Sequence, residues 1–243
     1  MNTQELYRPE VQTKLFDLDH VENKYATGIV AYGNKARTDL ESEYAGYLLL
    51  RGNVYAYQEH YMPIEDLNPD GTETDAEDNR SVHFSVIENS TNSIGKVVGA
   101  MRLIVKSEED SRPLPVEVHY PEAFSGCDVP FAGIEVSRLI GPGLIKWLLF
   151  AAGLNYANEF SLGPVLAVVK DSLADALDSI GVPVIRLAPA KFVEEYNSSK
   201  LPIQVNIEEL SKTLNREKSE VVNELKNVSE DFAYSGLLNE TDL

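Results

Sequence analysis

The strongest chemical signal in the sequence is an acid and a cation inside one apolar stretch, Ile134-Glu135-Val136-Ser137-Arg138-Leu139-Ile140. Burying a glutamate and an arginine costs free energy unless they are paired or take part in a reaction. Considered alone, the segment favours an ion pair that anchors a strand over a catalytic pair. In a regular strand Glu135 and Arg138 face opposite sides, so they can share one site only across a β-bulge. Such a bulge would also free a backbone N–H that could polarise a carbonyl.

A glycine-rich turn follows, with the spacing Arg138-x-x-Gly141-x-Gly143, and it leads directly into an apolar helix. Free N–H groups at such a turn can bind a phosphate. The spacing resembles the pyrophosphate loop of Gcn5-related acetyltransferases, Arg/Gln-x-x-Gly-x-Gly/Ala. Pro142 removes one of the donors, and two glycines also suit a plain turn between a strand and a helix. Both interpretations stay open.

Two further charged features of the sequence are candidates for a functional site. Arg102 lies inside the apolar stretch Gly99–Ile104, where it either reaches water from a strand end or works in a site. Asp75-x-x-Asp78 lies in a polar loop, and a solvated acidic loop is the simpler interpretation of that pair.

Other residue types exclude several function classes. The four histidines have no ligand spacing, and Cys127 is the single cysteine, so we expect no metal site, no disulfide framework and no cysteine nucleophile. With 21 basic against 39 acidic residues the net charge is −18, which makes nucleic acid an unsuitable partner. An anionic acyl carrier would need a local basic patch. The longest apolar stretch is too short to span a bilayer and no signal peptide is evident, so we expect a cytoplasmic protein.

The elements that must position these residues follow from periodicity and turn signals. We expect a strand or an N-terminal latch within 1–35, a helix over 38–60 capped by Thr38 and Glu41, and a hairpin over 82–105. After an irregular Pro-rich segment over 106–131, the remaining strands are expected at 134–140, 165–169, 182–187 and 202–207, with helices at 144–160, 172–180, 189–197 and 208–228. The pattern predicts a mixed α/β sheet in a domain over 1–207, followed by an amphipathic helix and a loose tail over 208–243.

Taken in order, these pieces resemble the acyl-homoserine lactone (autoinducer) synthases, a branch of the Gcn5-related N-acyltransferase (GNAT) superfamily. The matching positions are Arg51, Tyr55 and Tyr61, then Asp75 and Asp78, Arg102, the strand residues Glu135, Ser137 and Arg138, and the helix Leu149–Ala157. The two tyrosines replace the usual Phe and Trp, and the segment between Arg138 and the next helix is short. Long-chain N-acyl amino acid synthases share these features, and the sequence does not separate the two groups.

The resemblance implies an α/β (α+β) GNAT-like fold, with a central mixed, mostly antiparallel sheet that splays in a V and is flanked by helices. It implies an N-acyltransferase that moves a medium- or long-chain acyl group from acyl-carrier protein or acyl-CoA to a small amine, with S-adenosylmethionine or an amino acid as acceptor. The implied catalytic residues are Glu135, as proton acceptor, with Arg138 and Ser137. Substrate-binding residues would be Arg51, Tyr55, Tyr61, Asp75, Asp78 and Arg102, and donor-binding residues Arg138, Gly141 and Gly143.

Two alternatives remain open: a short-chain acetyl-CoA acetyltransferase, and a non-catalytic acyl- or lipid-binding module of the same fold. No permanently bound cofactor is expected, and the chain is expected to be a monomer or a weak homodimer.

Overall fold

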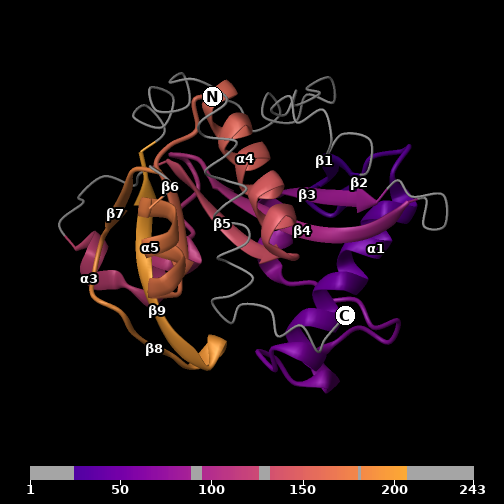
Figure 1. Ribbon diagram of the computed structural model, residues 1–243, viewed down its shortest axis with the longest axis horizontal. Helices are drawn as coiled ribbons and strands as arrows, with labels where there is room; N and C mark the ends of the chain where they lie inside the picture. Colours follow the sequence, from indigo (N-terminus) through magenta and orange to yellow (C-terminus); the bar gives the residue numbers. More distant parts are fainter. Residues whose placement is uncertain (1–24, 89–94, 126–131, 180–181, 207–243) are drawn as a thin grey trace.

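The computed structural model describes residues 25–88, 95–125, 132–179 and 182–206 (Figure 1). The strands are β1 (Tyr25–Tyr32), β2 (Lys35–Ala36), β3 (Ser81–Glu88), β4 (Lys96–Lys106), β5 (Gly133–Ile140), β6 (Val165–Val169), β7 (Val184–Arg186), β8 (Lys191–Val193) and β9 (Ser198–Val205). The helices are α1 (Glu41–Gly52), α2 (Pro115–His119), α3 (Pro121–Phe124), α4 (Gly143–Glu159) and α5 (Asp171–Ser179). A π-helical turn (Asn53–Gln58) continues α1, and 3-10 turns cover Ile64–Asp66, Ala76–Arg80 and Glu194–Tyr196.

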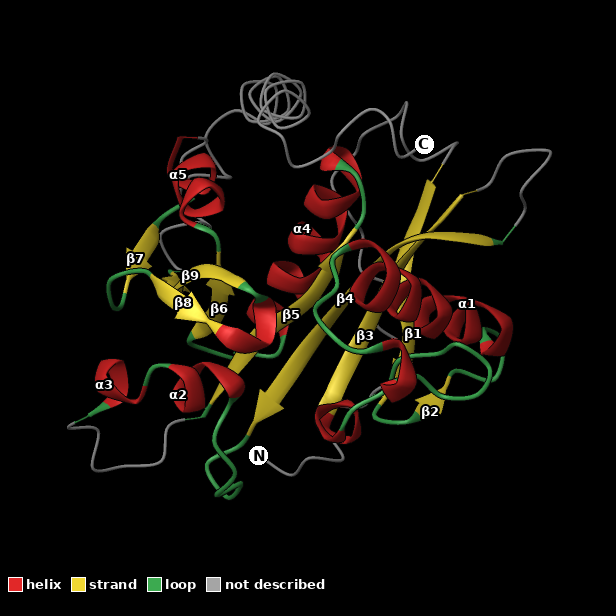
Figure 2. Cartoon of the chain, turned by 90° about the horizontal axis from the view of Figure 1, so that it is seen from below, coloured by secondary structure: helices red, strands yellow, loops and turns green. Residues whose placement is uncertain are grey.

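The strands form a sheet in the order β2-β1-β3-β4-β5-β6-β9-β7, with β8 paired to β9. Among the described strands only β5 and β6 are parallel, and their pairing covers just Ile134–Val136 against Val165–Ala167. Both strands continue past the last pair, so they separate towards their carboxyl ends. Figure 2 shows β6, β7 and β9 grouped apart from β1, β3 and β4. This confirms the predicted fold class: a mostly antiparallel sheet that splays in a V.

The sheet has a helix layer on each face. Alternate residues of the strands divide between them: Ile29 and Met101 join the core beneath α4 and α5, whereas Val30 and Ala100 pack with α1. Helix α4 crosses β3, β4 and β5 (Figure 1) and is apolar on most of its surface, as expected of a buried helix. The short helix α2 covers β4 and β6 on the α1 side through Ile104, Val116 and Leu166.

Two glycines, Gly99 and Gly141, let the first turn of helix α4 pack directly on the sheet. A Cβ added at Gly99 would lie 2.2 Å from the Cγ2 atom of Ile145, and one at Gly141 would lie 2.6 Å from the same methyl group. Gly141 also has a φ of 137°, which L side chains rarely adopt. The first turn of α4 is therefore fixed against β4 and the end of β5.

Most predicted elements match the observed ones, with three differences. Helix α1 begins at Glu41 with Leu40 in the cap position, so the predicted cap at Thr38 is wrong. The predicted helix over 189–197 is also wrong, because Lys191–Val193 pairs with β9 and only Glu194–Tyr196 forms a 3-10 turn. Two short helices, α2 and α3, occupy the segment expected to be irregular. The predicted helix over 208–228 and Cys127 lie outside the described residues. No helix in the described ranges is long and apolar enough to cross a membrane.

Candidate functional site

A β-bulge near the end of β5 organises the candidate site. The register runs from Arg102↔Ser137 to Ala100↔Ile140, so three steps along β5 oppose two along β4. Within the bulge Arg138 has a φ of 56°, a left-handed conformation that costs free energy for any residue with a Cβ. The bulge turns the Arg138 side chain towards the face that carries Ser137 and Arg102. The irregularity expected from the spacing of Glu135 and Arg138 is therefore present.

Three arginines and three carboxylates meet on this face, and we call them the arginine–carboxylate cluster. The cluster consists of Arg51, Arg102, Arg138, Glu73, Asp75 and Asp78. Each arginine contacts two carboxylates, and each carboxylate contacts two arginines, so the formal charges cancel. Such full pairing is what burial of charged groups requires.

Arg138 closes the exposed side of this cluster. Its Nη2 atom lies 3.0 Å from Glu73 Oε1 and 2.9 Å from Asp75 Oδ2. Its guanidinium carbon lies 4.5 Å from the centre of the Tyr55 ring, which is a cation–π contact. Ser137, the residue before it, accepts a 3.3 Å hydrogen bond from Arg102.

Asp78 is the centre of the cluster. Its Oδ1 atom lies 2.8 Å from Arg51 Nη1 and 2.7 Å from Arg102 Nη1, and its side chain is fully buried. Burial alone would raise the pKa of Asp78, but the two guanidinium groups outweigh burial and lower that pKa far below its ordinary value. The same balance lowers the pKa of Asp75 and of Glu73. These carboxylates stay ionised at neutral pH and are poorly suited to accept a proton.

The Asp75-x-x-Asp78 spacing has a local reason. Asp78 Oδ2 accepts from the Asp75 N–H (2.9 Å), and Asp75 Oδ1 accepts from the Glu77 N–H (2.8 Å), so the pair forms a capping box at the start of the 3-10 turn. The turn therefore fixes the positions of both carboxylates through local hydrogen bonds, independently of the arginines. Sequence reasoning missed Glu73, which is 2% exposed despite its position in a polar loop. The signal that could have found it is the closely spaced run Glu73-x-Asp75-x-x-Asp78.

Glu135 shares the face of this cluster but does not contact Arg138. Its Oε2 atom accepts a 2.8 Å hydrogen bond from the Val116 N–H at the first turn of α2, and the residue is 2% exposed. Burial raises the pKa of Glu135 to about 7. Glu135 therefore combines a pKa near neutrality with a structural hydrogen-bond partner on α2.

Aromatic rings form a row beside Arg138. Neighbouring ring centres lie 5.4 Å apart for Tyr55 and Tyr61, 6.0 Å for Tyr61 and Tyr196, and 5.6 Å for Tyr196 and His119. His119 Nε2 in turn lies 3.1 Å from Glu195 Oε2. The row links the turn after α1 with α2 and the segment before β9, across the separating strands. Tyr196 and His119 were not predicted as site residues, because nothing in their local sequence distinguishes them.

The glycine turn has a packing role whether or not it binds a ligand. Gly141 gives Ile145 room, as described above, and Pro142 is the cap residue of α4, which starts at Gly143. Arg138 points into the arginine–carboxylate cluster and has both its carboxylate partners there. Phosphate binding by this turn remains a prediction.

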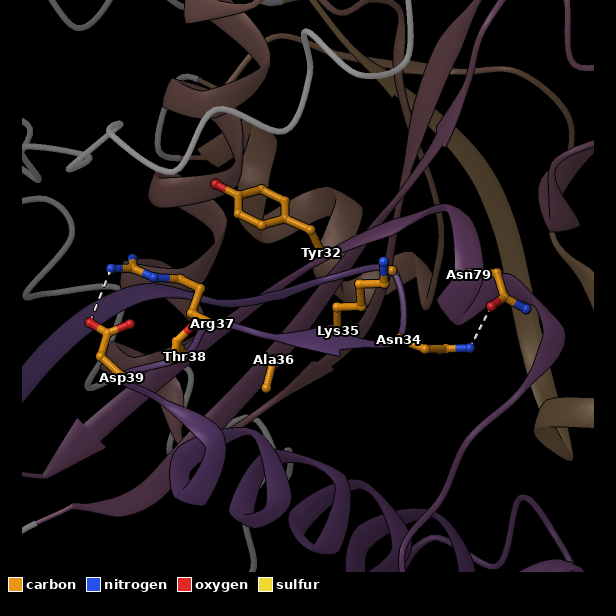
Figure 3. A pocket seen from close by; sticks show the side chains of 9 residues that line it. Tyr32, Asn34, Lys35, Ala36, Arg37, Thr38, Asp39 and Asn79 are labelled. Carbon is orange, nitrogen blue, oxygen red and sulfur yellow. Dashed lines mark hydrogen bonds and ion pairs between the residues drawn. The ribbon is translucent and has the colours of Figure 1, made fainter.

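An open pocket at the β1–β2 turn contains none of the predicted site residues. It is lined by Asn79 and the 32–39 segment that includes the β1–β2 turn (Figure 3). Its polar groups largely pair with one another: Asn34 bonds Asn79, and Arg37 bonds Asp39 at 3.3 Å. In the described part of the chain, no three His, Cys, Asp or Glu side chains are grouped as metal ligands would be.

The splayed sheet, the α4 turn and the bulged strand together define a GNAT-like acyltransferase fold. Solved structures with this fold include the acyl-homoserine lactone synthase LasI (15% identity, 76% of this chain and 91% of that chain covered, TM-score 0.57). They also include the CoA-dependent acyl-homoserine lactone synthase BjaI (19%, 79% and 89%, TM-score 0.59). A third is FeeM, an N-acyl amino acid synthase from uncultured soil microbes (14%, 76% and 92%, TM-score 0.51). No protein-family model matches the sequence, and no curated protein matches it. The predicted resemblance is thus confirmed at the level of the fold.

Proposed function

We propose that this protein is an N-acyltransferase that moves an acyl group from a thioester donor to the amine of a small acceptor. One observation carries the proposal: the bulge of β5 presents Arg138 and Ser137 beside the point where β5 and β6 separate. An open strand edge at that point can supply backbone donors to a thioester carbonyl, because no described strand pairs with this side of β5 beyond Val136.

The comparisons support the choice of reaction class. BjaI is described as CoA-dependent and has been solved with SAM and isopentyl-CoA, and FeeM is described as an N-acyl amino acid synthase. We carry over from these proteins acyl-CoA as the donor and S-adenosylmethionine or an amino acid as the acceptor. An acyl-carrier protein as the donor stays a prediction from the sequence resemblance. The path of a medium or long acyl chain stays a prediction, because α4 packs directly on β4 at Gly99 and Gly153.

The proposed chemistry is aminolysis. The acceptor arrives mostly as an ammonium and first loses a proton, for which Glu135 is the proposed acceptor, directly or through a water molecule. Its pKa of about 7 suits that task, whereas the lowered pKa values of Asp75 and Asp78 do not. The amine nitrogen then attacks the thioester carbon, and a backbone N–H of β5 stabilises the oxyanion. As the carbon–sulfur bond breaks, the nitrogen gives up its remaining extra proton to the departing thiolate, which leaves as a thiol.

The cluster arginines have a positioning role in this proposal. Because Arg51, Arg102 and Arg138 already share their guanidinium groups among internal carboxylates, they are poorly placed to grip a substrate carboxylate in a fork. They hold the loop that carries Asp75 against the bulge. Tyr55 and Tyr61, with Tyr196, form the wall of the proposed acceptor pocket.

Mass spectrometry of extracts from an overexpressing host tests the product class: acyl-homoserine lactones or N-acyl amino acids are expected over the vector control. Purified protein should then release CoA from medium-chain acyl-CoA in the presence of the acceptor. Glu135→Gln and Arg138→Ala should lower turnover at least about a hundredfold, as expected for loss of a proton acceptor or a strained positioning residue. Arg112→Ala, which removes an exposed arginine paired with Asp110, is the matched control.

Two outcomes would replace the proposal. Turnover restricted to acetyl-CoA would indicate a short-chain acetyltransferase. Acyl-CoA binding without any turnover in wild-type protein would indicate a binding module. Thermal shifts with acyl-CoAs of increasing length separate these cases, because only a long-chain site gains stability with each added methylene.

A further inference from the structure

A histidine on helix α2 lies one helical turn from the backbone N–H that holds Glu135. The Val116 N–H donates to Glu135 Oε2 at 2.8 Å, and His119 is three residues further along α2, on the same side of the helix. The end of α2 is fixed as well, because the Tyr120 hydroxyl donates to the Lys200 carbonyl on β9 at 2.5 Å. Helix α2 packs beside β6 (Figure 2), so His119 is held near the point where the strands separate.

His119 forms a carboxylate–imidazole pair with Glu195. Its Nε2 atom lies 3.1 Å from Glu195 Oε2, and the hydrogen bond from His119 holds the pKa of Glu195 below its ordinary value. An ionised carboxylate can only accept a hydrogen bond, so the ring carries a proton on Nε2 and, when neutral, leaves Nδ1 as an acceptor. A carboxylate in this position stabilises the imidazolium that forms when Nδ1 takes up a second proton.

Exposure to solvent increases from Glu135 through His119 to Glu195. Glu135 is 2% exposed, whereas the side chain of His119 is 18% exposed and that of Glu195 is 55% exposed. A buried general base must return its proton to water before the next turnover. The carboxylate–imidazole pair offers acid–base groups between the buried carboxylate and the solvent.

The charge of His119 acts on Glu135. Burial raises the pKa of Glu135, and the hydrogen bond from α2, Arg102 and a protonated His119 oppose this shift, whereas Glu77 adds to it. Arginine does not give up its proton in proteins, and Glu77 is engaged in an ion pair with Arg80. Among these groups, His119 is therefore the one suited to exchange a proton with Glu135 near neutral pH.

We propose that His119, oriented by Glu195, takes the proton from Glu135 and passes it to solvent in each round of acyl transfer. The acceptor ammonium first gives a proton to the Glu135 carboxylate. That proton then moves to Nδ1 of His119 through a water molecule, because no direct hydrogen bond joins these two described side chains. The imidazolium releases one proton to bulk water, which restores the carboxylate and the neutral ring. His119 acts through Glu135 and is a positioning residue; the inference rests on the proposed function for the reaction that protonates Glu135.

Steady-state turnover of a medium-chain acyl-CoA with the acceptor tests the relay in the full chain. His119→Gln and His119→Ala should each lower kcat about a hundredfold, the lower end of what general acid–base catalysis contributes. Added imidazole should restore turnover to His119→Ala as its concentration rises, because free imidazole can replace the missing ring. A purely structural contact between α2 and the 194–196 turn would give no such rescue.

Glu122→Gln is the matched control. Glu122 on α3 pairs with Lys191 on β8 at 3.0 Å, so this exposed ion pair connects neighbouring parts of the same two segments without facing Glu135. Its loss should leave turnover at the wild-type level. Circular dichroism checks that each variant is folded.

A second measurement does not require turnover. Carbon-13 NMR of glutamate carboxyl groups follows the titration of Glu135, whose signal is assigned as the one missing in Glu135→Gln. Because a protonated His119 lowers the pKa of Glu135, the carboxyl group should titrate at higher pH in His119→Gln than in wild type. The titration in Glu122→Gln should match that in wild type.

The proposal is overturned if His119→Gln turns over as wild type does, if imidazole fails to rescue His119→Ala, or if the Glu135 titration is the same without His119. A wild-type protein without turnover would contradict the proposed function instead. In that case an unchanged Glu135 titration would also overturn this inference, whereas a shifted titration would support the coupling of the two groups.

Discussion

Replacing Asp78 by alanine should destabilise the protein more than any exposed charge substitution. Asp78 is fully buried and receives Arg51 at 2.8 Å, Arg102 at 2.7 Å and the Asp75 N–H at 2.9 Å. Its removal leaves three buried guanidinium groups against two carboxylates. Breaking a buried ion pair by removing one partner costs about 3–5 kcal/mol. For a domain of this size that corresponds to a melting temperature lower by roughly 6–20 °C.

Urea unfolding followed by circular dichroism measures this loss. The matched control is Asp178→Ala, because Asp178 pairs with Arg186 on the surface, where both side chains are more than a third exposed. An exposed pair contributes about 0–1 kcal/mol, so the control should unfold almost as wild type does. A loss below about 1 kcal/mol for Asp78→Ala would refute the view that the cluster is held together by full charge pairing.

The pH dependence gives the same prediction a second readout. Arg51 and Arg102 depress the pKa of folded Asp78 far below its ordinary value of 3.8. A depressed carboxylate pKa stabilises the folded state above the unfolded value, and this contribution is lost as pH falls from that value towards the folded pKa. The stability difference between wild type and Asp78→Ala should therefore be constant near neutrality and shrink below about pH 4. A constant difference down to pH 2 would contradict the assigned electrostatic origin.

Two further predictions follow from single positions. Burial raises the pKa of Glu135 to about 7. As the pH rises from 5 to 8, the free energy of unfolding of wild type should therefore fall by on the order of 2–3 kcal/mol relative to that of Glu135→Gln, as measured by urea unfolding. An equal difference between the two proteins at pH 5 and pH 8 would argue against a raised pKa. Gly99→Ala should cost about 1–3 kcal/mol by overpacking against Ile145, whereas Gly28→Ala, with no atom within 4 Å of its added Cβ, should be tolerated, and melting temperatures check both.

The sequence predicts well those strands and helices whose secondary structure is decided by their own residues. Alternation defines β3 and β4, and the apolar run after Gly143 defines α4. The predicted helix over 189–197 rested on Pro189, which suits a first helical turn. It fails because the pairing of Lys191–Val193 with β9 decides the structure. Local propensity is weak against a strand partner that is distant in the sequence.

The same distinction applies to the site. The bulge at Arg138 could be inferred, because the apolar strand pattern and the three-residue spacing from Glu135 are incompatible with one shared face otherwise. The burial of Glu73 could not be inferred from the sequence, since a polar loop has no periodicity that marks a buried position. Tyr196 and His119 join the row of rings only because the turn before β9 and helix α2 are brought to the separated strands by the fold.

The charge pairing of the three cluster arginines has a consequence for the proposed function. Arg51, Arg102 and Arg138 are neutralised by the carboxylates of the cluster, and these ion pairs hold the bulged strand and the Asp75 loop in one geometry. The proposed reaction needs this fixed geometry, because the same bulge leaves the edge of β5 unpaired beyond Val136, where a backbone N–H would meet the thioester carbonyl. Arg138 would connect the cluster with the acceptor pocket, since its guanidinium group lies over the Tyr55 ring at one end of the row of rings.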